Sequence, residues 1–308
     1  MRKIVVIGGG SGSYTVLKGL KEYPVQLFSI VSMFDSGGST GRLRNELGVL
    51  PPGDVRRCVI ALADEDNENV LRELFLYRFE GGVQDHSLGN LVLTAAEKKY
   101  GNIGEGIKKL SKVLNLRGQV LPVSLDNAQL CAKLEDGKVI RGETNIDIAD
   151  AERGKISEAF LEPVAEANPD AKEAILDADV VIIGPGDLYT SLVPNLLVNG
   201  IPEALRKTRA KIVYVCNIMT KKGETDGFLA SDFVAEIENY ISRSVDHVIC
   251  NENNLNRVLL DRYRMENKFP VVFDLAHDHR VMIADIVSQE DFLRHDIKKL
   301  ARELISLC

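Results

Sequence analysis

The chain has 308 residues, 45% of them hydrophobic, and a formal net charge of −7. This composition supports a sizeable core, whereas the acidic balance excludes a basic face for binding nucleic acid. No apolar run approaches the ~18 residues that a membrane-spanning helix needs, and the five cysteines form no C-x-x-C pair. We therefore expect a cytoplasmic protein without disulfides, a zinc site or a membrane span.

The first part of the chain predicts a βαβ unit followed by helices. An apolar run at 4–7 indicates a strand, glycines turn the chain, and apolar residues at helical spacing over 14–20 indicate a helix. The next strand is predicted at 25–31. Apolar stripes with helical spacing then predict four helices, at 54–64, 68–79, 87–100 and 103–115.

The remaining chain changes pattern and then returns to the first one. Alternating residues and an Asp-Gly hairpin signal predict a β-rich insertion over about 118–165. Beyond it, apolar strands are predicted at 179–186, 211–217, 246–251 and 269–275, with helices between them. Such alternation predicts an α/β fold with a Rossmann-like, doubly wound, mostly parallel sheet. We expect residues 1–308 to form a single domain that carries the insertion.

The loop after the first strand predicts an anion site. Gly9, Gly10 and Gly12 leave backbone N–H groups at a helix N-terminus, and Ser11 and Ser13 add hydroxyls. This pattern favours phosphate or diphosphate, although a plain tight turn would also use these glycines. Ser13 stands where the G-x-G-x-x-G dinucleotide fingerprint has its third glycine, so that motif is incomplete. The P-loop motif G-x-x-x-x-G-K-[ST] does not occur in the sequence.

The segment after the second strand predicts a second anion site that faces the first. Asp35 stands where related folds hold a ribose, although an Asx turn would also explain it. Gly37 and Gly38 permit close approach, and Ser39 and Arg42 offer donors. Residues 37–41 also match the G-x-S-x-G elbow of hydrolases. That reading is disfavoured because the motif does not follow a strand directly.

Other polar residues follow predicted strands or begin a helix. His86 is a candidate base or ligand, or a helix cap; Asp187 suits a ribose or a metal, and Tyr189 suits a base. The amide, hydroxyl and carboxylate groups suit a sugar. The candidates in these loops are His86, Asn90, Gly184, Gly186, Asp187, Tyr189, Thr190, Asn217, Thr220, Glu224 and Thr225.

Several long motifs together resemble a known family. They are GGGSGSYTVLKGLKEYP, DSGGSTGRLRNELGVLPPGDVRRCVIALAD, HSLGNL, SKVLNLRGQVLP, DVVIIGPGDLYTSLVPNLL and NIMTKKGETDGFLASDF. In this order, and over nearly the whole chain, they are similar to the YvcK branch of the CofD-like family, a UPF0052-type family of gluconeogenesis factors. The other branch of that family resembles phospholactate transferases, which use a guanosine diphosphate-linked donor and magnesium.

The resemblance implies a function and two further site residues. It implies a cytosolic bacterial protein that is required for growth and cell shape on gluconeogenic carbon sources. It also implies binding of a UDP-sugar, UDP-N-acetylglucosamine in particular, with Tyr263 and Arg294 at the positions linked to that ligand. A second aspartate beside Asp35 is missing here, which counts against tight magnesium binding.

Three functions fit these loops. A nucleotide-sugar sensor needs diphosphate and sugar contacts but neither a catalytic residue nor a metal, and it would act through a regulatory protein partner. A transferase would add Mg²⁺ between carboxylates such as Asp35 and Asp187. An oxidoreductase would bind NAD with Asp35 on the adenosine ribose. We favour the sensor, and leave open whether the chain self-associates.

Overall fold

A computed structural model describes residues 1–64, 70–81, 85–148, 153–252 and 254–308. Its centre is a seven-stranded sheet in the order β10-β9-β8-β7-β1-β2-β3, in which neighbouring strands are parallel. The strands are β1 Arg2–Gly8, β2 Val25–Val31, β3 Gln119–Pro122, β7 Val180–Ile183, β8 Lys211–Val215, β9 His247–Asn251 and β10 Val281–Ala284. The predicted α/β fold with a mostly parallel sheet is confirmed.

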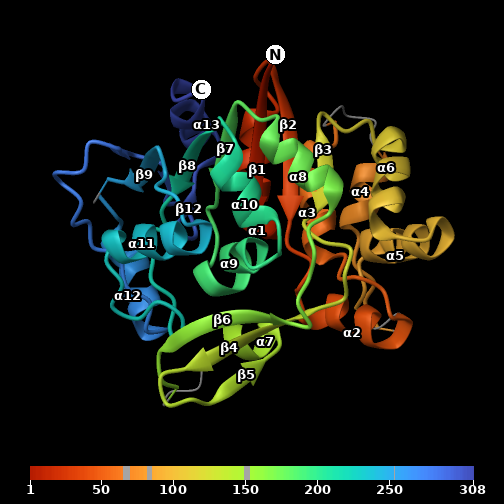
Figure 1. Cartoon of the computed structure of the whole chain (residues 1–308), viewed down its shortest axis with the longest axis horizontal. Coiled ribbons are helices and arrows are strands. Elements are labelled where there is room, and N and C mark those ends of the chain that lie inside the picture. The colour runs from red at the N-terminus through yellow and green to blue at the C-terminus, as the bar shows by residue number, and fades with distance from the viewer. Residues whose placement is uncertain (65–69, 82–84, 149–152, 253) are drawn as a thin grey trace.

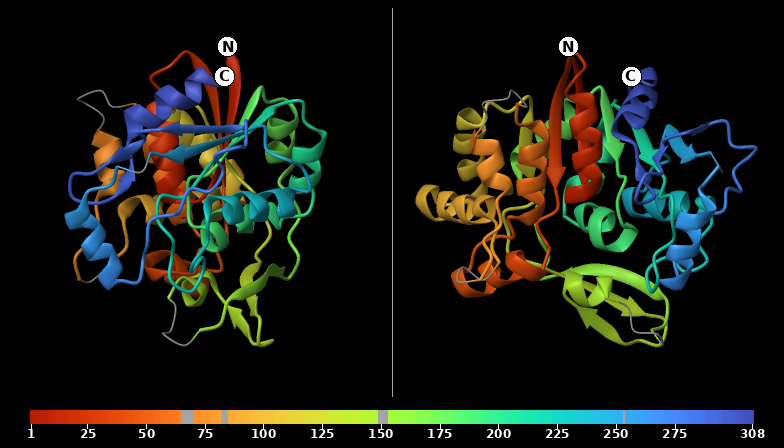
Figure 2. Two further views of the ribbon diagram at one scale, coloured as in Figure 1. Left: turned by 90° about the vertical axis from the view of Figure 1, so that its left-hand side faces the viewer. Right: turned by 180° about the vertical axis from the view of Figure 1, so that it is seen from behind.

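Helices cover both faces of this sheet. Figure 1 shows α8, α9, α10 and α11 in front, and Figure 2 shows α1, α3 and α13 on the opposite face. The helices on the sheet and around it are α1 Gly10–Leu20, α2 Gly38–Leu47, α3 Gly53–Leu62, α4 Val70–Leu76, α5 Leu88–Tyr100, α6 Ile103–Val113, α8 Pro169–Leu176, α9 Val193–Leu196, α10 Ile201–Lys207, α11 Ala230–Ile241, α12 Arg257–Met265 and α13 Ile297–Ser306. Their apolar sides bury β1, whose residues 4–7 have no exposed area.

The inserted sheet is confirmed, but it begins later than predicted. It contains the antiparallel strands β5 Val139–Arg141, β4 Gln129–Leu134 and β6 Ile156–Glu162, together with the short helix α7 Glu143–Asp147. Residues 119–122, which we assigned to it, form β3 and pair with β2 in the main sheet. The inserted sheet lies below the carboxyl ends of the main strands in Figure 1.

Two local predictions are wrong and one falls partly outside the described residues. Residues 269–275 form no strand of the sheet, because Pro270 lacks an N–H and the segment bonds to the loop after β8. The sheet edge is β10 instead. The segment after β2, where we expected a glycine-rich loop over residues 35–42, becomes helical at Gly38, the first residue of α2. Residues 68–69 of the predicted helix 68–79 lie outside the described part, and α4 ends at Leu76.

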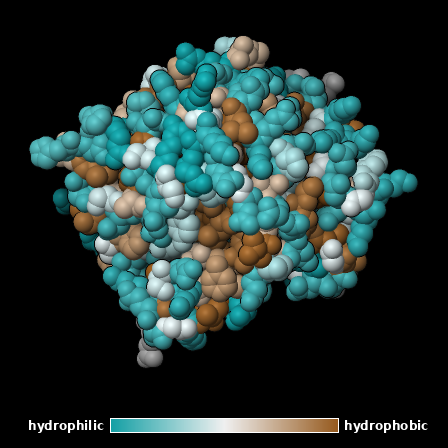
Figure 3. Space-filling view, viewed as in Figure 1, coloured by the Kyte–Doolittle hydropathy of each residue, from teal (hydrophilic) through white to brown (hydrophobic). Residues whose placement is uncertain are grey.

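The surface is largely polar. Figure 3 shows hydrophilic residues over most of one face, with hydrophobic residues gathered above the inserted sheet. Within the described residues, no helix combines the length and the apolar composition that crossing a bilayer requires.

Candidate functional site

The main cleft lies where the strand order reverses. The chain runs outward from β1 to β3 and later returns to place β7 on the other side of β1. The loops after β1 and β7 therefore separate at the carboxyl edge, which is where doubly wound folds bind ligands. A cleft of about 1290 Å³ opens there. It is lined by Ser11, Gly12, Tyr14, Thr15, Arg57, Asp147, Pro185, Gly186, Asp187, Asn217, Ile218, Met219, Thr220, Lys221, Tyr263, Lys268, Ser288, Glu290, Asp291, Phe292, Leu293, Arg294, His295, Asp296, Ile297 and Lys298.

The first glycine loop forms one wall of this cleft. Helix α1 starts at Gly10 directly after β1, with Ser11 and Gly12 on the cleft side. A Cβ atom on Gly12 would lie 1.7 Å from the carbonyl oxygen of Pro185. Gly12 is therefore required for the loops after β1 and β7 to touch. Gly9, Gly10, Ser13 and Gly184 support this contact without lining the cleft themselves.

A carboxylate already occupies the N-terminus of α1. The backbone N–H of Gly10 donates to Asp54 of α3, and a Cβ on Gly10 would lie 2.4 Å from Asp54 Oδ1. Burial, followed by the nearby Asp35 charge, raises the pKa of Asp54 to about 7. The guanidinium of Arg57 donates to the Ser11 hydroxyl beside it. Asp54 takes the Gly10 N–H, so an anion in the cleft would instead meet the first turn of α1 at Ser11 and Gly12, beside Arg57.

The second glycine segment does not line the cleft. The N–H of Gly37 donates to Asp35 Oδ1 at 2.8 Å, which forms the Asx turn that was the simpler interpretation. Ser39 Oγ lies 2.7 Å from His86 Nδ1, and Asn90 Nδ2 donates to the same hydroxyl at 3.1 Å. Burial, followed by the Arg42 charge, lowers the pKa of His86, which places Arg42 near His86. Arg42 and Gly38 are absent from the cleft wall.

Carboxylates separate the two glycine segments. Burial, followed by the charges of Asp35 and Asp147, raises the pKa of Glu143 to about 8. Burial also raises the pKa of Asp35, whose Oδ2 would lie 3.1 Å from a Cβ on Gly53. Together with Asp54, these groups form an acidic cluster behind the first loop. Such a cluster favours protons or a cation over a second phosphate group.

Four predicted sugar or base contacts are buried and hold the loops in place. Tyr189 donates its hydroxyl to Glu236 at 2.9 Å, so its ring is not free to stack on a base. Glu224 accepts the Tyr189 N–H at 3.2 Å and the Thr190 hydroxyl at 3.1 Å. Thr225 Oγ1 accepts the N–H of Lys221 at 2.9 Å. These residues position the wall and do not line the cleft.

The loop after β8 contributes direct lining residues. Asn217 Nδ2 donates to the carbonyl of Gly186 at 2.9 Å, which joins this loop to the loop after β7. Thr220 Oγ1 accepts the Phe269 N–H at 3.0 Å. Lys221 Nζ donates to Asp187 Oδ2 at 2.7 Å. The predicted Asn217, Thr220, Gly186 and Asp187 thus meet on one wall.

The C-terminal segment forms the opposite wall. Tyr263 of α12 and Arg294 of β12 Arg294–His295 both line the cleft, although both are far from the first loop in sequence. The Arg294 guanidinium lies 5.0 Å from the centre of the Phe292 ring, a cation–π contact. Burial lowers the pKa of His295 to about 4, so this imidazole is neutral near pH 7. This wall combines aromatic rings with charged groups of both signs, because Lys268, Arg294 and Lys298 lie along it with Glu290, Asp291 and Asp296.

Sequence reasoning missed several lining groups. Arg57 lies in α3 and Lys221 in the loop after β8, but arginine and lysine are common at surfaces and neither spacing set them apart. Asp147 lies in the insertion, so its place at the cleft depends entirely on tertiary structure. Phe292 and His295 adjoin Arg294 and could have been found from it.

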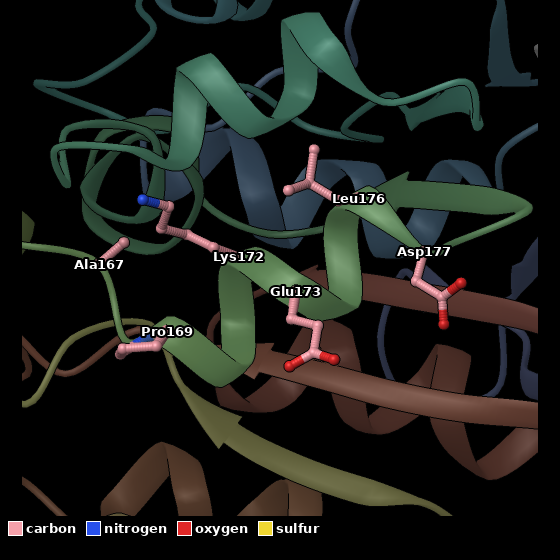
Figure 4. A pocket seen from close by; sticks show the side chains of 6 residues that line it. All are labelled: Ala167, Pro169, Lys172, Glu173, Leu176 and Asp177. Atoms are coloured by element: carbon pink, nitrogen blue, oxygen red, sulfur yellow. The ribbon is translucent and has the colours of Figure 1, made fainter.

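A second hollow lies away from these loops. It has a volume of about 630 Å³ and is lined by Ala167, Pro169, Lys172, Glu173, Leu176 and Asp177 of α8 and the residues around it. Figure 4 shows Glu173 and Asp177 on one side of α8 and Lys172 pointing another way. The side chains do not converge, so the cleft at the switch point is the better candidate.

Comparison with known proteins places the chain in a family. The family described as "2-phospho-L-lactate transferase CofD" matches residues 4–291. The chain belongs to the CofD family. Within it, the chain is 46% identical to a Thermotoga maritima protein named "Putative gluconeogenesis factor", covering 97% of each. It is 41% identical to the "Gluconeogenesis factor" of Bacillus subtilis, covering 99% of this chain and 98% of the other.

A solved CofD-family structure shares the fold. A Bacillus halodurans protein, titled a member of the UPF0052 family, is 40% identical and superposes with a TM-score of 0.93. The match covers 99% of this chain and 100% of that chain. The resemblance drawn from the motifs is confirmed.

Proposed function

We propose that this CofD-family chain is a regulatory protein that binds a UDP-sugar, UDP-N-acetylglucosamine in particular, in the cleft at the switch point. In this role it supports growth and cell shape on gluconeogenic carbon sources, in the cytoplasm and through a protein partner. The gluconeogenesis factor names of relatives at 41–46% identity over nearly their full length support the gluconeogenic role.

The proposal rests on which residues meet in the cleft. The cleft brings Ser11 and Gly12 of the first loop together with Tyr263 and Arg294, which lie about 250 to 280 residues later. A nucleotide sugar needs several such contacts at once: an anion-binding helix end, polar groups for hydroxyls and an aromatic or cationic wall. The cleft volume of about 1290 Å³ lies above the usual range for small-ligand sites and leaves room for an extended ligand.

The charges indicate how the ligand would lie. Its diphosphate would face the N-terminal end of α1 and Arg57, because these supply donors and positive charge together. The polar wall of Asn217 and Asp187 suits hydroxyl groups, and the Tyr263 and Arg294 wall suits the remaining ring. No step in this account needs a catalytic base.

A magnesium-dependent transferase is the second candidate. The family description names a transferase, and carboxylate oxygens of Asp147, Asp187 and Glu224 lie within 4.8 Å of one another, a hard, anionic donor set of the kind that a divalent cation prefers. Such a cation would neutralise charge on a diphosphate leaving group. Magnesium-dependent turnover of a nucleotide-diphospho donor would favour this function over the sensor.

An NAD-dependent oxidoreductase is the weakest of the three. It needs Asp35 to accept ribose hydroxyls, whereas Asp35 already accepts the Gly37 N–H and lies behind the cleft wall. Titration calorimetry with UDP-N-acetylglucosamine, UDP, GDP and NAD ranks the three functions. We expect UDP-N-acetylglucosamine to bind most tightly, and binding of NAD alone would contradict the proposal.

Arg294→Ala is expected to weaken UDP-N-acetylglucosamine binding at least tenfold. The guanidinium lines the cleft, and a charge-assisted hydrogen bond contributes about 1.5–3 kcal/mol. Calorimetry measures the loss. Arg302→Ala is the control, because that arginine lies on the exposed side of α13, outside the cleft. Equal affinity of the two variants would remove Arg294 from the site.

Arg57→Ala is expected to weaken binding more than Arg42→Ala does. Arg57 lines the cleft beside Ser11, whereas Arg42 lies near His86. We expect at least a tenfold loss for Arg57→Ala and less than threefold for Arg42→Ala in the same titration. The reverse order would move the diphosphate to the second glycine segment.

A further inference from the structure

Lys221 joins the inserted sheet to the cleft. Its ammonium group donates to Asp187 Oδ2 at 2.7 Å and lies 2.9 Å from Glu224 Oε1. It also donates to Asp147 at the end of α7, in the insertion. Burial opposes the charge of Lys221, but Glu224, Asp187 and Asp147 together raise its pKa above the ordinary value. One ammonium group thus connects three segments.

The three carboxylates differ in how firmly they are held. The Glu224 side chain has no exposed area and also accepts hydrogen bonds from Tyr189 and Thr190, so it is a fixed partner. The Asp147 side chain is 43% exposed and stands on a helix of five residues. The Asp187 side chain is similarly exposed, at 46%, but it follows Gly186, whose carbonyl Asn217 holds by a hydrogen bond. Asp147 is therefore the carboxylate most readily exchanged for another anion, because exposed ion pairs contribute little free energy.

The other end of α7 is attached to the second glycine segment. The N–H of Thr144 donates to Ser36 Oγ at 3.0 Å. Helix α7 is therefore held at its first turn by Ser36 and at its last residue by Lys221. Arg153 also donates to the carbonyls of Ile146 in α7 and of Gly223 in the loop after β8, so loss of the second attachment would loosen the end of α7 that faces the cleft without releasing it.

We propose that Lys221 exchanges Asp147 for the anionic part of the nucleotide-sugar ligand and so couples the occupied cleft to the inserted sheet. The inference rests on the proposed function, because it needs an anionic ligand in the cleft. Two carboxylates remain on Lys221 after the exchange, while the ligand phosphate replaces the third. The inserted sheet, which carries α7, then becomes more mobile when the ligand binds, and a partner protein detects this change.

The test uses Asp147→Asn with Asp285→Asn as its matched control. Asp285 also pairs with a lysine, Lys299, and its side chain is 41% exposed, but it does not line the cleft or touch Lys221. We expect Asp147→Asn to bind UDP-N-acetylglucosamine threefold to tenfold more tightly than the wild type, because no carboxylate must be displaced. Asp285→Asn is expected to change affinity less than twofold. Thermal unfolding checks that both variants are folded.

Hydrogen exchange followed by mass spectrometry measures directly how mobile the backbone of the inserted sheet is. Saturating UDP-N-acetylglucosamine is expected to speed exchange of amides 144–148 in the wild type, whereas Asp147→Asn exchanges quickly with or without ligand. Ligand binding that leaves these amides unchanged, or equal affinities for the two variants, would overturn this inference alone. A wild-type chain that binds no nucleotide sugar would overturn the proposed function as well.

Discussion

Gly12→Ala is expected to destabilise the protein by about 3 kcal/mol or more, the largest loss among the substitutions considered. The added methyl would lie 1.7 Å from the Pro185 carbonyl oxygen and 2.6 Å from its carbonyl carbon. Both atoms are backbone, so no side-chain rotation relieves the overlap and the loops after β1 and β7 must separate. The substitution would therefore also widen the cleft and reduce ligand affinity.

Urea unfolding followed by circular dichroism measures this loss. Gly154→Ala is the control, because a Cβ there meets no atom within 4 Å and its backbone needs no positive φ. We expect the control to change the free energy of unfolding by less than about 0.5 kcal/mol. Comparable stability of the two variants would mean that the loops do not touch as described.

Asp54→Asn is expected to stabilise the fold above neutral pH. In the unfolded chain this carboxyl group has a pKa near 3.8, and in the folded protein the pKa rises to about 7. Folding therefore favours the protonated form. The contribution of Asp54 to stability is fully present below pH 4 and is lost as the pH rises through 7. Asparagine removes this loss, which is on the order of 2–4 kcal/mol at pH 8.

Thermal unfolding between pH 5 and pH 9 tests whether Asp54 lowers the stability of the fold as the pH rises. The wild type is expected to lose stability from pH 5 to about pH 7 and little more above it, and Asp54→Asn is expected to lose less. The exposed Asp291→Asn serves as the control and should follow the wild type. A variant that is less stable than the wild type at pH 8 would show that the ionised carboxylate of Asp54 supports the fold.

The sequence predicted the architecture because periodicity depends on local composition. Apolar runs at 4–7 and 180–183 could only be buried strands, and the helical stripes between strands implied parallel pairing. The wrong predictions involve segments whose hydrogen-bond partners lie far away in the sequence. Residues 269–275 have strand-like composition, yet they bond to the loop after β8, which no local pattern reveals.

The candidate site was predictable where residues follow strands. Ser11, Gly186, Asp187 and Asn217 meet because the carboxyl ends of parallel strands share an edge. The second glycine segment could not be placed in the same way. Its residues 38–47 form a helix whose Ser39 and Arg42 lie near His86, and an acidic cluster that includes Asp54 of α3 and Glu143 of α7 lies between it and the first loop.

A crystal structure of the complex with UDP-N-acetylglucosamine tests the central claim most directly. The account predicts that the diphosphate lies over Ser11 and Gly12 beside Arg57, between the loops after β1 and β7, and that Arg294 contacts the same molecule. A nucleotide bound elsewhere, such as in the hollow beside α8, or a diphosphate held by the segment at residues 37–42, would contradict it.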